Sequence, residues 1–313
     1  MKNNPMTTCV VIATYNGCEY IVEQLDSIKN QTYPVDKVII RDDGSTDNTV
    51  DVIHKYIIDN KLNWEVRENE KNLGWRRNFF ELIKEADTDL VFLCDQDDIW
   101  EPDKVEIYID IFRKKKRINV LASNYKVLSD DDQFNSLWDS QQDDKKLKKF
   151  RFDSRFYYIR RPGCTFCFRN EYVRRILKYW DEDWAHDMLI WLCAVVSDNI
   201  YLYNGVTMQY RRYGNNATGN SDKRDLLKGS EFITQYADKA LMYLREIKNY
   251  AQEDKLDNLD YKKKIINQAI DFFEIRKKWA ETKKFSYGIR LLKYIRFYMS
   301  PKQYLGDWVR IYR

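Results

Sequence analysis

Short apolar runs alternate with helical patterns along the first 115 residues, and this alternation limits the folds that the chain can adopt. Residues 8–13, 37–41 and 89–94 are rich in β-branched and other apolar side chains, as strands covered on both faces are. Each run is followed by apolar residues at helical spacing. Parallel strands joined by single helices need right-handed crossovers. The pattern therefore predicts an α/β fold whose mainly parallel sheet is flanked by helices.

The last third of the chain has a different pattern. Its apolar residues recur every three or four positions, as in amphipathic helices. We therefore predict two domains, residues 1–220 and a C-terminal helical extension over residues 221–313. Between these patterns, residues 130–149 are poor in aliphatic side chains and predict a solvated loop, while residues 201–203 and 208–211 predict two short strands.

Polar side chains follow three of the predicted strands at the point where each strand ends. They are residues 14–16, the pair Asp42 and Asp43, and the pair Asp95 and Asp97. Because ligands of open α/β sheets bind at the carboxyl ends of the strands, we expect a site at this edge. Two carboxylates can hold Mg²⁺ or Mn²⁺, which would bridge the oxygens of a diphosphate. A solvated acidic turn is the alternative for the last pair alone.

Charge is distributed unevenly between the body and the C-terminal segment. The net charge of +4 is too small for a dedicated nucleic-acid-binding protein. Residues 283–313, however, hold eight basic residues and one acid, Asp307, so this segment carries +7 and the rest −3. The segment also contains many aromatic residues, which predicts an amphipathic helix in the interface of an anionic membrane. The alternative is a helix packed on the protein with a solvated basic face.

No apolar run reaches about 18 residues, so no membrane span is expected. Residues 1–8 hold one Lys and no apolar stretch, so no secretory signal is expected either. We therefore expect a cytoplasmic protein whose six cysteines are thiols. Cys164 and Cys167 form one C-x-x-C, but a zinc site needs two further ligands at a compatible spacing. Two thiols in a half-buried strand are the interpretation that we adopt.

Several motifs in order resemble the family-two glycosyltransferases, inverting enzymes of the GT-A fold, over residues 7–220. They are Val-Ile-Ala-Thr-Tyr-Asn-Gly at 11–17, Asp-Asp-Gly-Ser-Thr-Asp at 42–47, Asn-Leu-Gly at 72–74 and Cys-Asp-Gln-Asp-Asp-Ile-Trp at 94–100. The last motif resembles the branch that contains bacterial rhamnosyltransferases of cell-surface polysaccharide synthesis. The resemblance implies a UDP- or dTDP-linked sugar donor, a glycan or lipid-linked acceptor, and a place on the inner face of the plasma membrane.

The resemblance also implies roles for residues on the donor side. The nucleotide pocket would be lined by Thr14, Tyr15 and Asn16. Asp42 or Asp43 would accept a hydrogen bond from the base. Asp95 would face the ribose beside the metal, and Asp97 would ligate the metal.

On the acceptor side, the resemblance implies that Asp187 is the catalytic base and that Gly163 begins the acceptor loop. Trp184 would form a wall for a sugar ring, and a buried core tryptophan is its alternative. His186 would orient the acceptor or pack beside the base. Asp187 precedes an apolar helix, so a helix cap is the alternative role for its carboxylate.

One departure from the family pattern concerns the segment Tyr-Arg-Arg-Tyr-Gly-Asn-Asn at 210–216. Many relatives carry a histidine where Tyr213 stands, so an imidazole contribution to metal or diphosphate binding is in doubt. Arg211 and Arg212 can supply positive charge instead, because a guanidinium matches phosphate geometry. Two exposed strand arginines are the alternative.

Two other functions fit an α/β chain with acidic strand ends. A sugar nucleotidyltransferase also uses acidic metal sites, but it should carry a glycine-rich basic loop near the N-terminus, and residues 10–17 lack one. A non-catalytic partner of a synthase would keep the fold, but the presence of Asp95, Asp97 and Asp187 argues against it.

Overall fold

The computed structural model describes residues 6–129, 143–212, 229–254 and 256–313. The chain divides into two compact units. The sheet unit comprises Met1–Phe150, Arg161–Trp191 and Asn199–Tyr213, and the helical unit comprises Arg151–Arg160, Leu192–Asp198 and Gly214–Arg313. The predicted boundary near residue 220 lies outside the described residues. Two short segments that we assigned to the first domain, residues 151–160 and 192–198, group with the helical unit instead.

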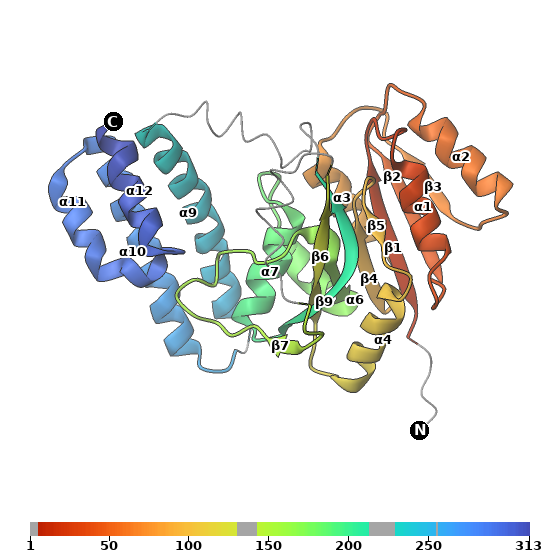
Figure 1. Ribbon diagram of the computed structural model, residues 1–313. Helices are drawn as coiled ribbons and strands as arrows, with labels where there is room; N and C mark the ends of the chain where they lie inside the picture. The colour runs from red at the N-terminus through yellow and green to blue at the C-terminus, as the bar shows by residue number, and fades with distance from the viewer. Residues whose placement is uncertain (1–5, 130–142, 213–228, 255) are drawn as a thin grey trace. The chain divides into compact units, whose positions relative to one another are not determined.

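A nine-stranded mixed sheet forms the sheet unit (Figure 1), and its strand order is β3-β2-β1-β4-β8-β6-β9-β5, with β7 paired to β9. The strands are β1 (Thr8–Thr14), β2 (Lys37–Asp42), β3 (Glu65–Glu68), β4 (Leu90–Cys94), β5 (Ile99–Trp100), β6 (Val120–Leu128), β7 (Leu147–Lys149), β8 (Phe166–Arg169) and β9 (Ile200–Arg211). Strands β1 to β4 are parallel to one another, and β8 runs antiparallel to both β4 and β6. The predicted α/β fold is confirmed.

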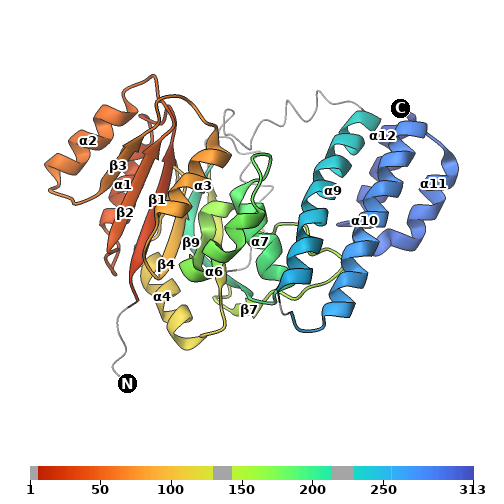
Figure 2. The ribbon, with the colours of Figure 1, turned by 180° about the vertical axis from the view of Figure 1, so that it is seen from behind.

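Helices cover both faces of the parallel part of the sheet (Figures 1 and 2). They are α1 (Ile21–Lys29), α2 (Thr49–Asp59), α3 (Trp75–Glu85), α4 (Lys104–Lys114), α6 (Asn170–Ile176) and the first turns of α7 (His186–Val196). Val10 and Ile12 of β1 share one buried cluster with Leu25 of α1, Ile53 of α2 and Ile109 of α4. Alternate residues of a strand point to opposite faces, so the uninterrupted apolar run of β1 fills the core on both sides.

Two sequence predictions for the middle of the chain were wrong in detail. The predicted short strands at 201–203 and 208–211 are one strand, β9, whose pairing with β6 shifts in register around Asn124. Residues 147–149, expected in a solvated loop, pair with β9 as β7. Bulges of this kind leave no clear period-two pattern in the sequence.

The helical unit contains two long helices, α9 (Ser230–Glu253) and α10 (Leu259–Thr282), and three shorter segments, α11 (Phe285–Arg290), a 3₁₀ segment (Leu291–Phe297) and α12 (Pro301–Tyr312). Aromatic rings join these elements: the ring centroids of Trp279 and Trp308 are 4.6 Å apart. A Cβ at Gly288 would lie 2.5 Å from the Trp308 ring and 2.7 Å from the Trp279 ring, so α11 packs against both. No described helix is long and apolar enough to span a membrane.

A buried ion pair joins α10 to α12. Arg276 is 1% exposed, and its guanidinium donates to both carboxylate oxygens of Asp307 at 2.6 and 2.7 Å. The Tyr298 hydroxyl donates to the same carboxylate at 2.9 Å. The single acid of residues 283–313 is therefore neutralised inside the unit, and this segment forms part of its core.

Candidate active site

Residues 95–98, which we call the acidic loop, follow β4 and are held in place by Arg211 of β9. The backbone N–H of Arg211 donates to Asp98 Oδ1 at 3.0 Å, and its Nε donates to the Asp97 carbonyl at 2.8 Å. The Arg211 guanidinium also pairs with Glu23 and lies 4.4 Å from the Tyr20 ring centroid. Arg211 thus fixes the acidic loop, and the predicted phosphate contact would compete with these bonds.

Four carboxylates gather around this loop. Ligand atoms of Asp95, Asp98 and Cys164 all lie within 4.8 Å of one another. Burial, followed by the negative charges of Asp97 and Asp187, raises the pKa of Asp95 to about 7. Burial and the charge of Asp95 also hold the pKa of Asp98 well above its usual value. Carboxylates this close cannot all ionise without a positive charge between them.

The chemistry of this cluster fits a hard divalent cation. Mg²⁺ and Mn²⁺ prefer oxygen ligands, which Asp95 and Asp98 provide. Burial holds the pKa of the Cys164 thiol well above its usual value, so the thiol stays protonated and is a poor ligand. The sequence predicts Asp97 as a ligand, and the structure places Asp98 of the same motif in the cluster. Asp97 is 8% exposed, and its role as a ligand remains a prediction.

A buried lysine that we did not predict lies next to this cluster. Lys104, the first residue of α4, is fully buried, and its Nζ donates to the Cys164 carbonyl at 3.1 Å and lies 3.9 Å from the Trp100 ring centroid. Burial lowers its pKa to about 8, while the charge of Asp98 opposes this shift. Helical spacing was the available signal, because Lys104 stands one turn before the core residue Tyr108.

On the nucleotide side, Asp42 organises the loops after β1 and β2. Its Oδ1 accepts a hydrogen bond from the Thr14 hydroxyl at 2.9 Å, and its Oδ2 accepts one from the Ser45 N–H at 2.7 Å. The carboxylate is 1% exposed. Both oxygens of Asp42 are therefore engaged within the protein, and the contact to a base predicted for Asp42 or Asp43 remains a prediction.

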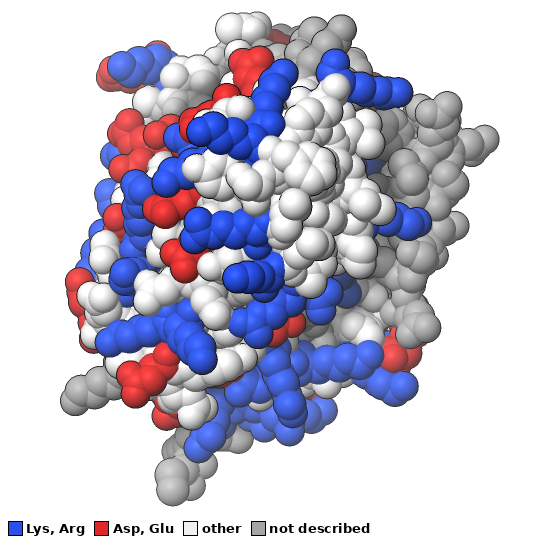
Figure 3. Space-filling model, turned by 90° about the vertical axis from the view of Figure 1, so that its left-hand side faces the viewer, with Lys and Arg blue, Asp and Glu red and all other residues white. Residues whose placement is uncertain are grey.

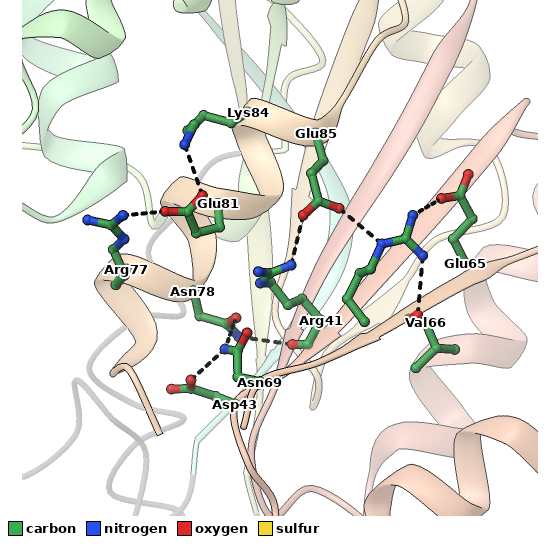
Figure 4. Close-up of polar contacts among 11 residues, drawn as sticks. Arg41, Asp43, Glu65, Val66, Asn69, Arg77, Asn78, Glu81, Lys84 and Glu85 are labelled. Carbon is green, nitrogen blue, oxygen red and sulfur yellow. Dashed lines mark hydrogen bonds and ion pairs between the residues drawn. The ribbon is translucent and has the colours of Figure 1, made fainter. Parts of the chain in front are cut away.

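Asp43 belongs to a network that reaches β2, α3 and the Asn-Leu-Gly motif (Figure 4). Its Oδ1 accepts hydrogen bonds from Asn69 Nδ2 and from the Leu73 N–H, both at 2.8 Å. Asn69 also donates to Asn78 at 3.0 Å, and Asn78 donates to the Arg41 carbonyl at 2.9 Å. Among the described residues, these contacts to Asp43 all go to Oδ1, and the residue is 2% exposed.

The loop after β1 is locked to the acidic loop. Gln96 accepts a hydrogen bond from the Tyr15 N–H at 2.8 Å and donates one to the Tyr15 carbonyl at 3.1 Å. A Cβ at Gly17 would lie 2.2 Å from Gln96 Oε1, so only glycine permits this approach. Asn16 adopts φ +47° and accepts a hydrogen bond from the Thr46 N–H at 2.8 Å. Tyr15 is 45% exposed, so its ring lies at the surface beside the carboxyl ends of the strands.

Asp187 and Gly163, both predicted on the acceptor side, lie in contact. Asp187 stands in the first turn of α7, and its Oδ1 accepts a hydrogen bond from the Met188 N–H at 2.8 Å. A Cβ at Gly163 would lie 2.8 Å from Asp187 Cβ. Because Gly163 precedes Cys164, the same short segment brings Asp187 to the carboxylate cluster.

We expect Gly163→Ala to lower catalytic turnover about tenfold by displacing Asp187, because misplacing a reacting group by about 1 Å is costly. The matched control is Gly306→Ala, since a Cβ there meets nothing within 4 Å. Turnover of both variants should be compared at saturating donor. Equal turnover of the two variants would show that the position of Asp187 does not limit the reaction.

Burial bears on two residues predicted on the acceptor side, Trp184 and His186. Trp184 is fully buried, so its indole cannot form a wall for a sugar and is a core residue. His186 is 6% exposed and stacks on Phe79 with ring centroids 4.0 Å apart. Burial, with the charge of Arg76, lowers the pKa of His186 to about 3, so the ring is neutral. His186 therefore packs beside Asp187, as its alternative role proposed.

Arg212, the second predicted cation, directly follows Arg211 at the end of β9. The N–H of Arg212 donates to the Leu128 carbonyl at 2.9 Å, and its guanidinium lies 5.3 Å from the Tyr210 ring centroid. Its predicted phosphate contact remains a prediction, and Tyr213 lies outside the described residues. Cys164 and Cys167 are buried free thiols, and only Cys167 lies in a strand, β8, because Cys164 belongs to the 3₁₀ turn Gly163–Thr165.

Comparison with known proteins supports the fold and the family. The chain is 27% identical to the dTDP-rhamnosyl transferase RfbG of Shigella flexneri over 86% of this chain and 96% of that protein. It is 38% identical over 98 residues to the poly(ribitol-phosphate) β-N-acetylglucosaminyltransferase TarS of Staphylococcus aureus, which covers 30% of this chain and 16% of TarS.

Solved structures share this fold at low sequence identity. The crystal structure of S. aureus TarS 1–349 in complex with UDP-GlcNAc has a TM-score of 0.61 at 19% identity and covers 98% of this chain and 82% of that chain. The mannosyltransferase PcManGT from Pyrobaculum calidifontis in complex with GDP-Man and Mn²⁺ has a TM-score of 0.55 at 15% identity, over 93% and 76% of the two chains. These likenesses confirm the GT-A-like fold.

The family model for glycosyl transferase family 2 matches residues 9–177, more than half of the chain. This range contains β1 to β4, the acidic loop and the Gly163 segment. The protein therefore belongs to glycosyltransferase family 2, whose members transfer a sugar from a nucleotide sugar.

Proposed function

We propose that the enzyme transfers rhamnose from a UDP- or dTDP-linked donor to a glycan or lipid-linked acceptor during synthesis of a bacterial surface polysaccharide. The transfer would be metal-dependent and would invert the anomeric centre. The observation that carries the proposal is the convergence of Asp95, Asp98 and Asp187 around the Gly163–Cys164 segment. The choice of rhamnose rests on RfbG, which is similar over almost its whole length.

The donor would bind along the edge formed by the loops after β1, β2 and β4. Asp43 Oδ2 would accept a hydrogen bond from the base, while Asp42 holds the surrounding loops. Thr14, Tyr15 and Asn16 line this edge, and Tyr15 offers an exposed ring to the nucleotide. A base with an N–H donor, such as uracil or thymine, matches a carboxylate acceptor.

The reaction needs a base on one side of the sugar and stabilisation of the departing diphosphate on the other. Asp187 would remove the proton from the acceptor hydroxyl as that oxygen attacks the anomeric carbon, where positive charge develops. Asp95, Asp97 and Asp98 would hold Mg²⁺ or Mn²⁺, which neutralises the charge of a leaving diphosphate when bound. The buried His186 stays neutral and supports Asp187 through packing.

The two rival functions are less well supported. A sugar nucleotidyltransferase does not fit the family match over residues 9–177. A non-catalytic partner would have no need for a buried cluster of carboxylates, which costs stability. A turnover assay that measures the nucleoside diphosphate released from a panel of nucleotide sugars would separate an enzyme from such a partner and identify the donor.

Binding of a nucleoside diphosphate should require a divalent cation and should be at least tenfold weaker in Asp97→Ala. The reason is that the diphosphate and the acidic loop repel each other without the cation. Calorimetric titration of UDP and of dTDP, with Mn²⁺ and with excess chelator, measures this. The control is Asp59→Ala, an exposed acid of α2 in the same unit. Equal affinity with Mn²⁺ and with chelator would remove the metal from the proposal.

We place the reaction at the inner face of the plasma membrane, where lipid-linked acceptors would be reached. This location rests on the cationic C-terminal segment and is argued from its structure below.

A further inference from the structure

Large apolar side chains are exposed in an uneven way over the described part of the chain. Thirteen are strongly exposed, and eight of them lie within residues 285–312. The eight, which we call the apolar face, are Phe285, Ile289, Leu292, Ile295, Met299, Leu305, Val309 and Tyr312. Scattered single apolar residues are normal on a protein surface, but a concentration like this marks a binding surface.

Helical spacing aligns these side chains into two stripes. Phe285, Ile289 and Leu292 follow one another at intervals of four and three residues, and Leu305, Val309 and Tyr312 repeat the same intervals on α12. Residues at this spacing share one face of a helix. The ring centroids of Phe285 and Trp308 are 4.7 Å apart, so the stripe of α11 lies next to α12.

Within residues 283–313, every exposed charged residue is positive. Residues 283–313 carry eight exposed cations, which are Lys283, Lys284, Arg290, Lys293, Arg296, Lys302, Arg310 and Arg313. Asp307, the one acid of the segment, is 2% exposed and is neutralised by Arg276. Figure 3, which faces this side of the molecule, shows a broad uncharged surface beside many Lys and Arg side chains, among which Asp and Glu are interspersed.

We propose that the apolar face docks on an anionic lipid bilayer, with its side chains at the boundary between headgroups and acyl chains and its cations among the lipid phosphates. This combination suits a bilayer because long basic side chains extend to the headgroups while apolar side chains are buried. A second copy of the chain fits poorly, since it would bring eight cations against eight. This docking would explain how the enzyme reaches the inner face of the plasma membrane. It is inferred from the exposed apolar and basic side chains and is independent of the transfer reaction.

The structure also decides how the proposal is tested. Deleting residues 283–313 would remove Asp307 from Arg276 and would expose Trp279, so the helical unit would lose its core. Point substitutions on the exposed stripe avoid this problem. Leu305 and Val309 are 61% and 52% exposed, and glutamine keeps a helix at both positions.

The experiment is sedimentation of the full chain with vesicles of phosphatidylglycerol and phosphatidylcholine, and with vesicles of phosphatidylcholine alone. We expect binding to the anionic vesicles that weakens as salt rises to about 1 M, where charges are screened beyond about 3 Å. Leu305→Gln combined with Val309→Gln should weaken this binding at least tenfold. Ile58→Gln is the control, because Ile58 is 73% exposed on α2 and should leave binding unchanged.

Three results would overturn the proposal. One is that the full chain does not bind anionic vesicles at low salt, and another is that the double variant binds them as tightly as the parent. The third is that the parent is a dimer, the double variant is a monomer, and neither binds vesicles. This result would show that the apolar face binds a second copy of the chain. Two further measurements separate this proposal from the proposed function. The double variant should still bind UDP or dTDP in the calorimeter, and Asp97→Ala should still bind anionic vesicles.

Discussion

Asp187→Asn should lower the rate of sugar transfer by about a hundredfold or more without unfolding the protein, the scale expected for loss of a positioned general base. Asparagine has nearly the shape of aspartate but cannot take a proton from the acceptor hydroxyl at neutral pH. The Met188 N–H donates to Asp187 Oδ1 at 2.8 Å, and an asparagine carbonyl can accept the same bond. The fold of α7 should therefore persist.

The same substitution tests the alternative role of Asp187 as a helix cap. A cap works nearly as well with asparagine as with aspartate, so transfer would then barely change. UDP or dTDP binding should persist in either case, because its contacts are expected from Asp43 and the acidic loop. Near-normal turnover of Asp187→Asn with an unchanged melting temperature would place the base elsewhere.

A neighbouring acid provides the matched control for this measurement. Asp183 lies three residues before His186 on the same segment and is exposed. Asp183→Asn removes one negative charge from the same region without touching Gly163 or the carboxylate cluster. Its turnover should equal that of the parent, so a loss confined to Asp187→Asn isolates the base from a general charge effect.

The parallel half of the sheet could be predicted from sequence because its strands are buried on both faces. Such strands appear as uninterrupted apolar runs, and the bounds of β1, β2 and β4 agree with the predicted runs within one residue. β9 could not be recognised as one strand, because its pairing with β6 shifts around Asn124 and its exposed and buried residues lose a simple alternation. The mixed part of the sheet was therefore predicted less well.

Positions of candidate site residues could be predicted from sequence where a motif follows a strand. They could not be predicted where the role of a residue depends on whether its side chain is buried. Asp43 and Asp95 follow β2 and β4 directly, as the strand-end motifs predict, and their roles remain predictions. Trp184 was misassigned because a tryptophan before a helix has the same sequence signature whether it lines a site or fills a core. Lys104 was missed because a lysine in the first turn of a helix is ordinarily exposed.

Asp307→Ala should lower the free energy of unfolding of the helical unit by about 3–5 kcal/mol. This is the cost of leaving a buried charge without its partner. Arg276 would remain 1% exposed with its guanidinium unpaired, and Tyr298 would lose the carboxylate that accepts its hydroxyl hydrogen. Urea unfolding measures this change.

Two further variants keep this prediction falsifiable. Asp238→Ala breaks the exposed pair between α9 and Lys277 in the same unit, and such pairs contribute under about 1 kcal/mol. Replacing Arg276 with Met and Asp307 with Leu together removes both charges, which is often neutral for a buried pair. The double variant should therefore recover most of the stability lost in Asp307→Ala. If Asp307→Ala is as stable as Asp238→Ala, the buried pair between Arg276 and Asp307 does not hold α12 to α10.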